Sequence, residues 1–207
     1  MTRFGDKRRM RIGLLGGSFN PAHAGHAHIA RAALRLLRLD QVWLLVSPGN
    51  PLKSGVGMAP LAQRLASAER LCTNRHLRAT DIEAQLGTRY TADTLRALRQ
   101  RFPRARFVWL MGADNLRQLP SWKSWQRITR LMPIAVLPRP GSTRTALASQ
   151  AAQRLRHDRL RPGAGILLAR SAAPRWSLLP IRENPLSATQ IRSRRQRLRS
   201  AASPKEF

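Results

Sequence analysis

The 207-residue chain has little negative charge: ten Asp and Glu residues face 38 Lys and Arg residues, and its formal net charge is +28 at pH 7. This balance excludes an acidic disordered tail and is compatible with polyanionic partners, whether phosphorylated metabolites, nucleic acid or a membrane surface. Lysine is scarce as well, because only four of the 38 basic residues are Lys and the other 34 are Arg. An excess of this kind does not by itself choose among those partners.

Cysteine and long hydrophobic runs are also scarce. The single cysteine, Cys72, cannot form an intramolecular disulfide, which favours a reducing compartment. No uninterrupted apolar run approaches the roughly 20 residues of a membrane span. The apolar stretch at residues 12–15 is too short for the core of a signal peptide. We therefore expect a cytoplasmic protein with no membrane partner.

The length and the ordinary 43% hydrophobic fraction allow one compact domain. We expect a basic extension at residues 1–10, a single domain at 11–199 and a tail at 200–207. Residues 139–163 are rich in Pro, Gly, Ser and Arg, and they predict a mobile surface excursion with one short helical stretch. No pattern specifies an oligomeric state.

Expected strands and helices alternate along the chain. Apolar runs predict strands at residues 11–15, 42–46, 77–82, 107–111, 134–137 and 166–169. Helical spacing and capping signals predict helices at residues 25–37, from Pro60, at 91–101 with Thr91 as the cap, at 122–131, and at 188–199 with Ser187 as the cap. This alternation is typical of a doubly wound, Rossmann-like α/β domain with a parallel sheet.

The segment between the first expected strand and helix carries the most information. Residues 16–26 read Gly-Gly-Ser-Phe-Asn-Pro-Ala-His-Ala-Gly-His. Glycines allow the backbone to approach a phosphate, and a helix N-terminus offers free N–H groups to an anion. His23 and His26 could then stabilise charge that develops on a phosphate. The glycine spacing excludes the P-loop and the usual dinucleotide fingerprint, and the alternative is a glycine turn with two incidental histidines, such as a metal pair.

This loop resembles the nucleotide-binding signature of the HxGH nucleotidyltransferase superfamily, and in particular that of bacterial nicotinate-nucleotide adenylyltransferases. Further segments are similar to family motifs in the same order: residues 88–95 (S/T-x-Y-T-x-D/E-T-L), 108–114 (a strand, then G-x-D), 119–122 (P-x-W), 139–141 (R-P-G) and 184–192 (I-S-S/A-T-x-I-R). The resemblance runs from residue 11 to about residue 194. It implies the reaction of ATP with nicotinate mononucleotide to give deamido-NAD and pyrophosphate, a step of NAD biosynthesis.

The resemblance further implies in-line attack of the mononucleotide 5′-phosphate on the α-phosphorus of ATP, without an enzyme nucleophile. Catalysis would then rest on positioning and charge stabilisation, with Mg²⁺ bound through the substrate phosphates and no metal site in the protein. His26 is assigned to the α-phosphate and transition state, His23 to the neighbouring phosphates and Arg192 to the β- and γ-phosphates. The implied ATP site comprises Gly16, Gly17, Ser18, Phe19, His23, Gly25, His26, Gly112, Asp114, Ser187, Thr189 and Arg192. Asp114 would accept hydrogen bonds from the ribose hydroxyls. Alternatively, it would only cap a short helix.

The mononucleotide site implied by the resemblance comprises Asn20, Lys53, Tyr90, Thr91 and Trp122. The flat face of Trp122 would stack on the pyridine ring. Tyr90 and Thr91 would line the nicotinate side, where backbone amides receive its carboxylate. Lys53 is a candidate phosphate contact in a loop that reads Asn-Pro-Leu-Lys, where many relatives have P-P-H-K. Two other tryptophans, Trp109 and Trp125, are expected to pack in the core or on the surface.

Two rival functions remain open at this point. One is an adenylyltransferase of the same superfamily that acts on nicotinamide mononucleotide. The other is an Arg-rich nucleic-acid-binding protein, which the net charge and the basic run at residues 192–199 would suit. That run has no interleaved aromatic residues, and the sequence has no RRM, KH or zinc-finger pattern. We therefore expect ATP and nicotinate mononucleotide as partners and no specific nucleic acid.

Overall fold

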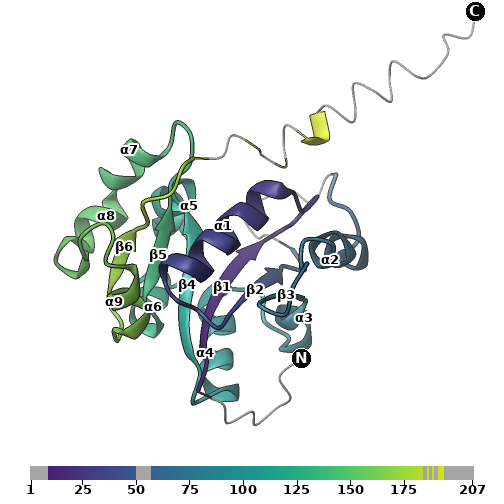
Figure 1. Ribbon diagram of the computed structural model, residues 1–207, viewed down its shortest axis with the longest axis horizontal. Helices are drawn as coiled ribbons and strands as arrows, with labels where there is room; N and C mark the ends of the chain where they lie inside the picture. The colour runs from purple at the N-terminus through teal and green to yellow at the C-terminus, as the bar shows by residue number, and fades with distance from the viewer. Residues whose placement is uncertain (1–8, 50–56, 184–185, 187, 189–190, 194–207) are drawn as a thin grey trace, which may run out of the picture.

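The computed structural model describes residues 9–49, 57–183, 186, 188 and 191–193. Within these residues one sheet of six parallel strands has the order β3-β2-β1-β4-β5-β6 (Figure 1). The strands are β1 (Arg11–Gly17), β2 (Gln41–Val46), β3 (Leu77–Thr80), β4 (Arg106–Gly112), β5 (Ile134–Leu137) and β6 (Trp176–Leu178). The predicted doubly wound α/β fold is confirmed.

Helices cover both faces of this sheet, and in Figure 1 α1 crosses in front of the central strands. The α-helices are α1 (Ala24–Leu36), α2 (Leu61–Glu69), α3 (Ile82–Gln85), α4 (Thr91–Arg101), α5 (Ala113–Gln118), α6 (Trp125–Leu131), α7 (Thr143–Leu147), α8 (Gln150–Arg154) and α9 (Gly165–Arg170). Two 3-10 turns, η1 (Leu119–Ser121) and η2 (Arg156–Asp158), complete the described elements. None of the helices in the described part of the chain has the length and apolar character needed to cross a membrane.

Successive residues of the central strands enter two different hydrophobic cores. In β2, Trp43 and Leu45 join the core that α4, α5 and α6 cover, whereas Val42 and Leu44 join the core that α1, α2 and α9 cover. Side chains alternate between the two faces of a strand, so a sheet buried on both faces needs apolar residues at every position. This requirement explains why the central strands read as uninterrupted apolar runs in the sequence.

The edge of the sheet that forms the site is fixed by the strand order. After β1 the chain builds β2 and β3 on one side, and it then returns to place β4, β5 and β6 on the other side of β1. The carboxyl ends of β1 and β4, at Gly17 and Gly112, therefore lie next to each other where the order reverses. Ligands of open α/β sheets bind at this reversal point.

The strand expected at residues 166–169 is wrong. These residues lie in α9, and the sixth strand is β6, further along the chain. In α9, Leu168 and Ala169 are buried while Ile166 and Leu167 are exposed, as on a helix with one inward face. A run of four apolar residues is compatible with a buried strand and with a helix, which is why the pattern misled.

Residues 139–163 also differ from expectation. Instead of an irregular excursion with one helical stretch, they form α7, α8 and η2 and bury Ala146, Ala151, Ala152 and Leu155 in the core. Alanines give a weak periodic signal in the sequence, because they occur on buried and exposed helix faces alike. The mobility of this segment stays a prediction.

Several element boundaries shift by a few residues. The strand expected at 77–82 ends at Thr80 and is followed by the unpredicted α3. The cap of α4 is Tyr90 rather than Thr91, which is its first residue. The helix expected from residue 122 begins at Trp125, because Ser124 has a left-handed backbone with φ of 55°. The helix expected at 188–199 lies largely outside the described residues.

Candidate active site

The loop between β1 and α1 holds His23 and His26 as reciprocal caps of the helix. Nδ1 of His23 accepts a hydrogen bond from the Gly25 amide at 3.1 Å, and Nδ1 of His26 accepts one from the His23 amide at 3.2 Å. A neutral imidazole whose Nδ1 accepts carries its proton on Nε2. Both rings therefore offer an Nε2–H donor beside the helix N-terminus, where anions bind favourably.

Gly25 is required by the position of the first ring. A Cβ atom at Gly25 would lie 2.8 Å from Nδ1 of His23, a distance that side-chain carbons do not tolerate. The two imidazole centroids are 3.9 Å apart, and the buried Phe19 ring lies behind His26 with its centroid at 4.7 Å. The residues between Gly16 and His26 thus fix both rings in one arrangement.

Both histidines are neutral at pH 7. Burial, followed by the charge of Arg139, lowers the pKa of His23. Burial lowers the pKa of His26 to about 3, with further contributions from His23 and Arg139. A neutral imidazole with its proton on Nε2 can donate one hydrogen bond to a phosphate oxygen, and a bound polyphosphate would favour the charged form of the ring. Arg139, which the sequence assigned only to a turn motif, is therefore part of the site's electrostatics.

A buried arginine binds the loop between β1 and α1, here called the phosphate loop, to the neighbouring loops. Arg64 of α2 is 2% exposed and donates four hydrogen bonds, all to backbone carbonyls. The acceptors are Ser18 at 2.8 Å, Ser47 at 2.6 Å, Pro48 at 3.1 Å and Ala59 at 2.8 Å. Its four bonds join the end of β1, the end of β2 and the approach to α2, and no sequence pattern had singled this residue out.

Asn20 and Arg192 lie beside the carbonyl groups that Arg64 binds. The Asn20 side chain donates to the Gly57 carbonyl at 2.9 Å and accepts from the Ala59 amide at 3.3 Å. Arg192 donates to the Asn20 carbonyl at 2.7 Å. Both residues line a second cavity between the phosphate loop and α2. Their assignments to the mononucleotide and to the ATP phosphates stay predictions.

The end of β4 forms the second half of the candidate site, next to the end of β1 at the carboxyl edge of the sheet. After Gly112 the chain turns into α5, where Oδ1 of Asp114 lies 3.7 Å from Nε of Arg139. Both atoms are buried, and neither has a hydrogen-bond partner among the described residues. Buried polar atoms without partners are rare in native proteins and often mark places where a ligand completes the network. The role of Asp114 toward a ribose hydroxyl stays a prediction.

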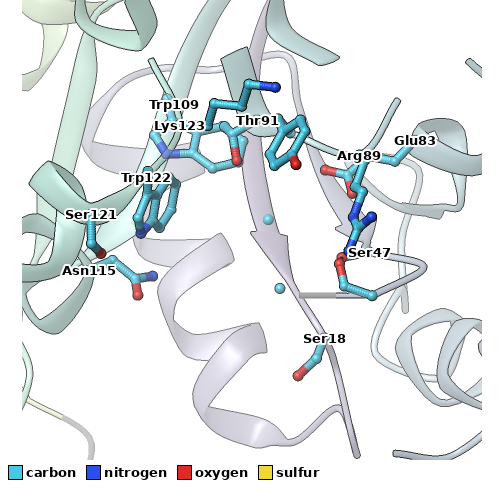
Figure 2. A pocket seen from close by; sticks show the side chains of 14 residues that line it. Ser18, Ser47, Glu83, Arg89, Thr91, Trp109, Asn115, Ser121, Trp122 and Lys123 are labelled. Atoms are coloured by element: carbon cyan, nitrogen blue, oxygen red, sulfur yellow. The ribbon is translucent and has the colours of Figure 1, made fainter. Parts of the chain in front are cut away.

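A cavity of about 410 Å³ opens beside the phosphate loop, within the range of small-ligand sites (Figure 2). Six of the predicted site residues line it: Gly16, Gly17, Ser18, Tyr90, Thr91 and Trp122. Lining residues that the sequence did not assign to the site are Ser47, Gly49, Glu83, Arg89, Trp109, Asn115, Ser121 and Lys123. The cavity thus connects the phosphate loop with the start of α4 and with the turn after η1.

Trp109 has the packing role expected of it and a second role in the cavity wall. Its ring is 3% exposed, and a Cβ atom at Gly16 would lie 2.5 Å from its Cη2 atom. Gly16 therefore makes room for an aromatic ring. Trp125 is buried in the core, as expected.

Glu83 is a buried carboxyl group in the wall opposite Trp122 (Figure 2). Its side chain belongs to the one-turn helix α3 and is 8% exposed. Burial raises the pKa of Glu83 to about 7, and a hydrogen bond from Ser47 opposes part of this rise. In the sequence, only the scarcity of acidic residues could have drawn attention to Glu83.

Three predicted site residues, Lys53, Ser187 and Thr189, lie outside the described residues. Within the described ranges, no three His, Cys, Asp or Glu side chains are grouped closely enough to hold a metal ion. The site that the structure describes is therefore one of backbone donors, two imidazoles and aromatic walls.

Comparisons with known proteins bear on the family to which the chain belongs. A family model described as cytidylyltransferase-like matches residues 14–194. The chain is 59% identical over 183 residues to the "Probable nicotinate-nucleotide adenylyltransferase" of Gluconobacter oxydans (strain 621H), which covers 88% of this chain and 94% of that relative. A protein of the same name from Gluconacetobacter diazotrophicus is 54% identical over 200 residues, covering 97% of this chain and 93% of that relative.

The fold also matches solved structures. Plasmodium falciparum nicotinic acid mononucleotide adenylyltransferase complexed with NaAD superposes with a TM-score of 0.66 at 16% identity, over 88% of this chain and 82% of that chain. A likeness at this identity supports the fold, whereas the sequence relatives identify the family. On these grounds, the chain belongs to the family of nicotinate-nucleotide adenylyltransferases.

Proposed function

We propose that the protein transfers the adenylyl group of ATP to nicotinate mononucleotide, giving deamido-NAD and pyrophosphate in NAD biosynthesis. The observation that carries this function is the pair of neutral histidines at the N-terminus of α1, next to a cavity that ends at Trp122. The first feature suits a polyphosphate and the second a flat aromatic ring. Membership of the family supports the same reaction.

In the proposed reaction, an oxygen of the mononucleotide 5′-phosphate attacks the α-phosphorus of ATP. A new P–O bond forms, the bond to the bridging oxygen of the β-phosphate breaks, and pyrophosphate leaves. The protein needs to align the two phosphates and stabilise the charge that develops on the α-phosphate oxygens. Nε2–H of His26 suits this task because its cap holds the ring in place before substrate arrives. His23 would serve the adjoining phosphates.

The two substrates would occupy the two halves of the sheet edge. Gly17 and Ser18 would approach the phosphates, and Asp114 would accept a hydrogen bond from the adenosine ribose. Trp122 would stack on the pyridine ring, with Tyr90 and Thr91 beside its carboxylate. Supporting this division, the cavity is lined by Gly17, Ser18 and the three pyridine-side residues. Oδ1 of Asp114, just after the end of β4, has no hydrogen-bond partner among the described residues.

We expect ATP to bind as its magnesium complex. The carboxylate described beside the phosphate loop, Asp114, faces Arg139 and so is a poor member of a cation cage. The donor set therefore suits an ion whose ligands are mainly phosphate oxygens, and such an ion would neutralise charge on the triphosphate. We place the reaction in the cytoplasm because a single cysteine suits a reducing compartment.

A coupled pyrophosphate-release assay tests the function directly. We expect release with ATP and nicotinate mononucleotide, and slower release with nicotinamide mononucleotide. A clear preference for the nicotinamide compound would overturn the proposed acceptor. No release with either acceptor, together with tight binding of unrelated nucleic acids at physiological salt, would instead support the rival nucleic-acid-binding function.

A further inference from the structure

The pyridine end of the cavity carries a positive charge that the sequence analysis did not assign. Lys123 directly follows Trp122, and both residues line the cavity. Its Nζ atom lies 4.2 Å from the centroid of the Tyr90 ring, within the range of a cation–π contact. Tyr90 lines the cavity too and is the residue before α4. The tyrosine ring therefore holds the lysine ammonium at the cavity rim.

The charges around this ammonium leave the pyridine end positive. Figure 2 shows Glu83 with Arg89 and Ser47 on the far side of the cavity from Trp122. The acidic residue in the first turn of α4, Asp93, forms an ion pair with Arg96 at 3.2 Å. Neither carboxylate is the partner of Lys123 in the described contacts, where its contact is the Tyr90 ring. A carboxylate that entered beside Trp122 would meet this ammonium at the rim.

We propose that Lys123 is a specificity-determining residue, whose ammonium favours the carboxylate of nicotinate over the carboxamide of nicotinamide. This inference rests on the proposed function and deepens it. The two groups have nearly the same shape but differ by one negative charge, so a steric pocket cannot separate them. Backbone N–H groups can donate to an oxygen of either group. An ammonium attracts the charged carboxylate more strongly than the neutral carboxamide, whose carbonyl oxygen can accept only a weaker hydrogen bond and whose NH₂ cannot accept one.

The general excess of positive charge cannot produce this discrimination. Both mononucleotides carry a phosphate and are drawn to a chain of net charge +28, so the overall field assists both acceptors. A difference between them must come from charges within a few ångströms of the pyridine substituent, because exposed charges further away are screened by salt. Lys123 lies at that end of the cavity.

The test is the ratio of kcat/KM for nicotinate mononucleotide to that for nicotinamide mononucleotide at saturating ATP. We expect Lys123→Gln to lower this ratio about fivefold, as for an exposed ion pair, mainly through a higher KM for the nicotinate compound. Lys123→Arg, which keeps the charge, should restore most of the ratio. The matched control is Arg127→Gln, which removes one charge from an exposed position of α6 that does not line the cavity.

The outcomes are distinguishable. An unchanged ratio in Lys123→Gln overturns the proposal, as does an equal loss with both acceptors, which would indicate a structural role. A ratio that falls as far in Arg127→Gln would assign the discrimination to general charge and also overturn it. If the unmodified protein used neither mononucleotide, the proposed function itself would fail, independently of Lys123.

Discussion

The two ends of the candidate site are built in different ways. At the phosphate end, backbone hydrogen bonds and buried side chains hold each group: His23 and His26 cap each other's turn, and Arg64 binds four carbonyls. At the pyridine end, Trp122 is partly buried and Lys123 exposed, and both come from a turn. Rigid elements suit the alignment of reacting phosphates, whereas adjustable side chains suit the choice of acceptor. Changes at the first end should lower kcat and stability, and changes at the second should alter KM.

The largest expected effect is on turnover, from His26→Ala. Removal of the Nε2–H donor should lower kcat by about a hundredfold or more, the cost of one preorganised donor to developing charge. The matched control is His28→Ala, since His28 lies on the same helix but contacts the Arg182 carbonyl. Steady-state kinetics for both variants, with circular dichroism to confirm folding, make the measurement. Near-normal turnover of His26→Ala would remove His26 from the mechanism.

Arg64→Met should have the largest effect on stability. It leaves the carbonyls of Ser18, Ser47, Pro48 and Ala59 without their donor, and we expect the free energy of unfolding to fall by about 3 kcal/mol. Urea denaturation measures this change. Because the guanidinium holds the phosphate loop, kcat should fall as well, and Arg64→Lys should recover only part of both losses. A stable variant with normal kcat would show that the loop needs no such fastening.

Glu83 should make stability depend on pH. Its pKa is about 7 in the folded protein against 4.5 in the unfolded chain, so the folded state binds more protons between these values. The free energy of unfolding should therefore fall as pH rises from 4.5 to 7. In Glu83→Gln this loss disappears, and the variant should be more stable than the unmodified protein by up to about 3 kcal/mol near pH 8, with little difference at about pH 4. Thermal unfolding of the unmodified protein and of Glu83→Gln across this pH range measures the effect. Equal pH profiles for the two proteins would contradict the prediction.

A smaller effect than these three concerns the acceptor alone. Trp122→Ala should raise KM for nicotinate mononucleotide about tenfold, through loss of ring stacking and its buried area, while KM for ATP stays the same. Initial-rate measurements with each substrate varied in turn give both constants. If KM for ATP rises instead, Trp122 belongs to the ATP half and the division of the site is wrong.

The phosphate end and the pyridine end of the candidate site are encoded differently in the sequence. The strand, loop and helix around His23 and His26 are contiguous, so local patterns are sufficient there. Glu83, Arg89, Lys123 and Arg139 come from separate connections, and only the strand order brings them to one edge. The error at residues 166–169 has a related cause. A run of four apolar residues does not reveal whether a helix or a strand buries it, since that depends on what packs against it.

The role of Arg64 could not be predicted from the sequence for a different reason. As one arginine among 34 it carries no local signal, and its function as a buried donor depends on three loops that meet around it. The high net charge in turn agrees with anionic substrates but did not identify them. Which basic residues contribute to the site depends on their burial and on neighbouring side chains, such as Tyr90 beside Lys123.

A competition experiment tests the central claim most directly. The protein is incubated with ATP, magnesium and equal concentrations of nicotinate and nicotinamide mononucleotides, and the dinucleotide products are identified by mass spectrometry. The account predicts that deamido-NAD predominates and that the summed rate of formation of both dinucleotides equals the rate of pyrophosphate release. A product mixture dominated by NAD, or the absence of both dinucleotides, would contradict it.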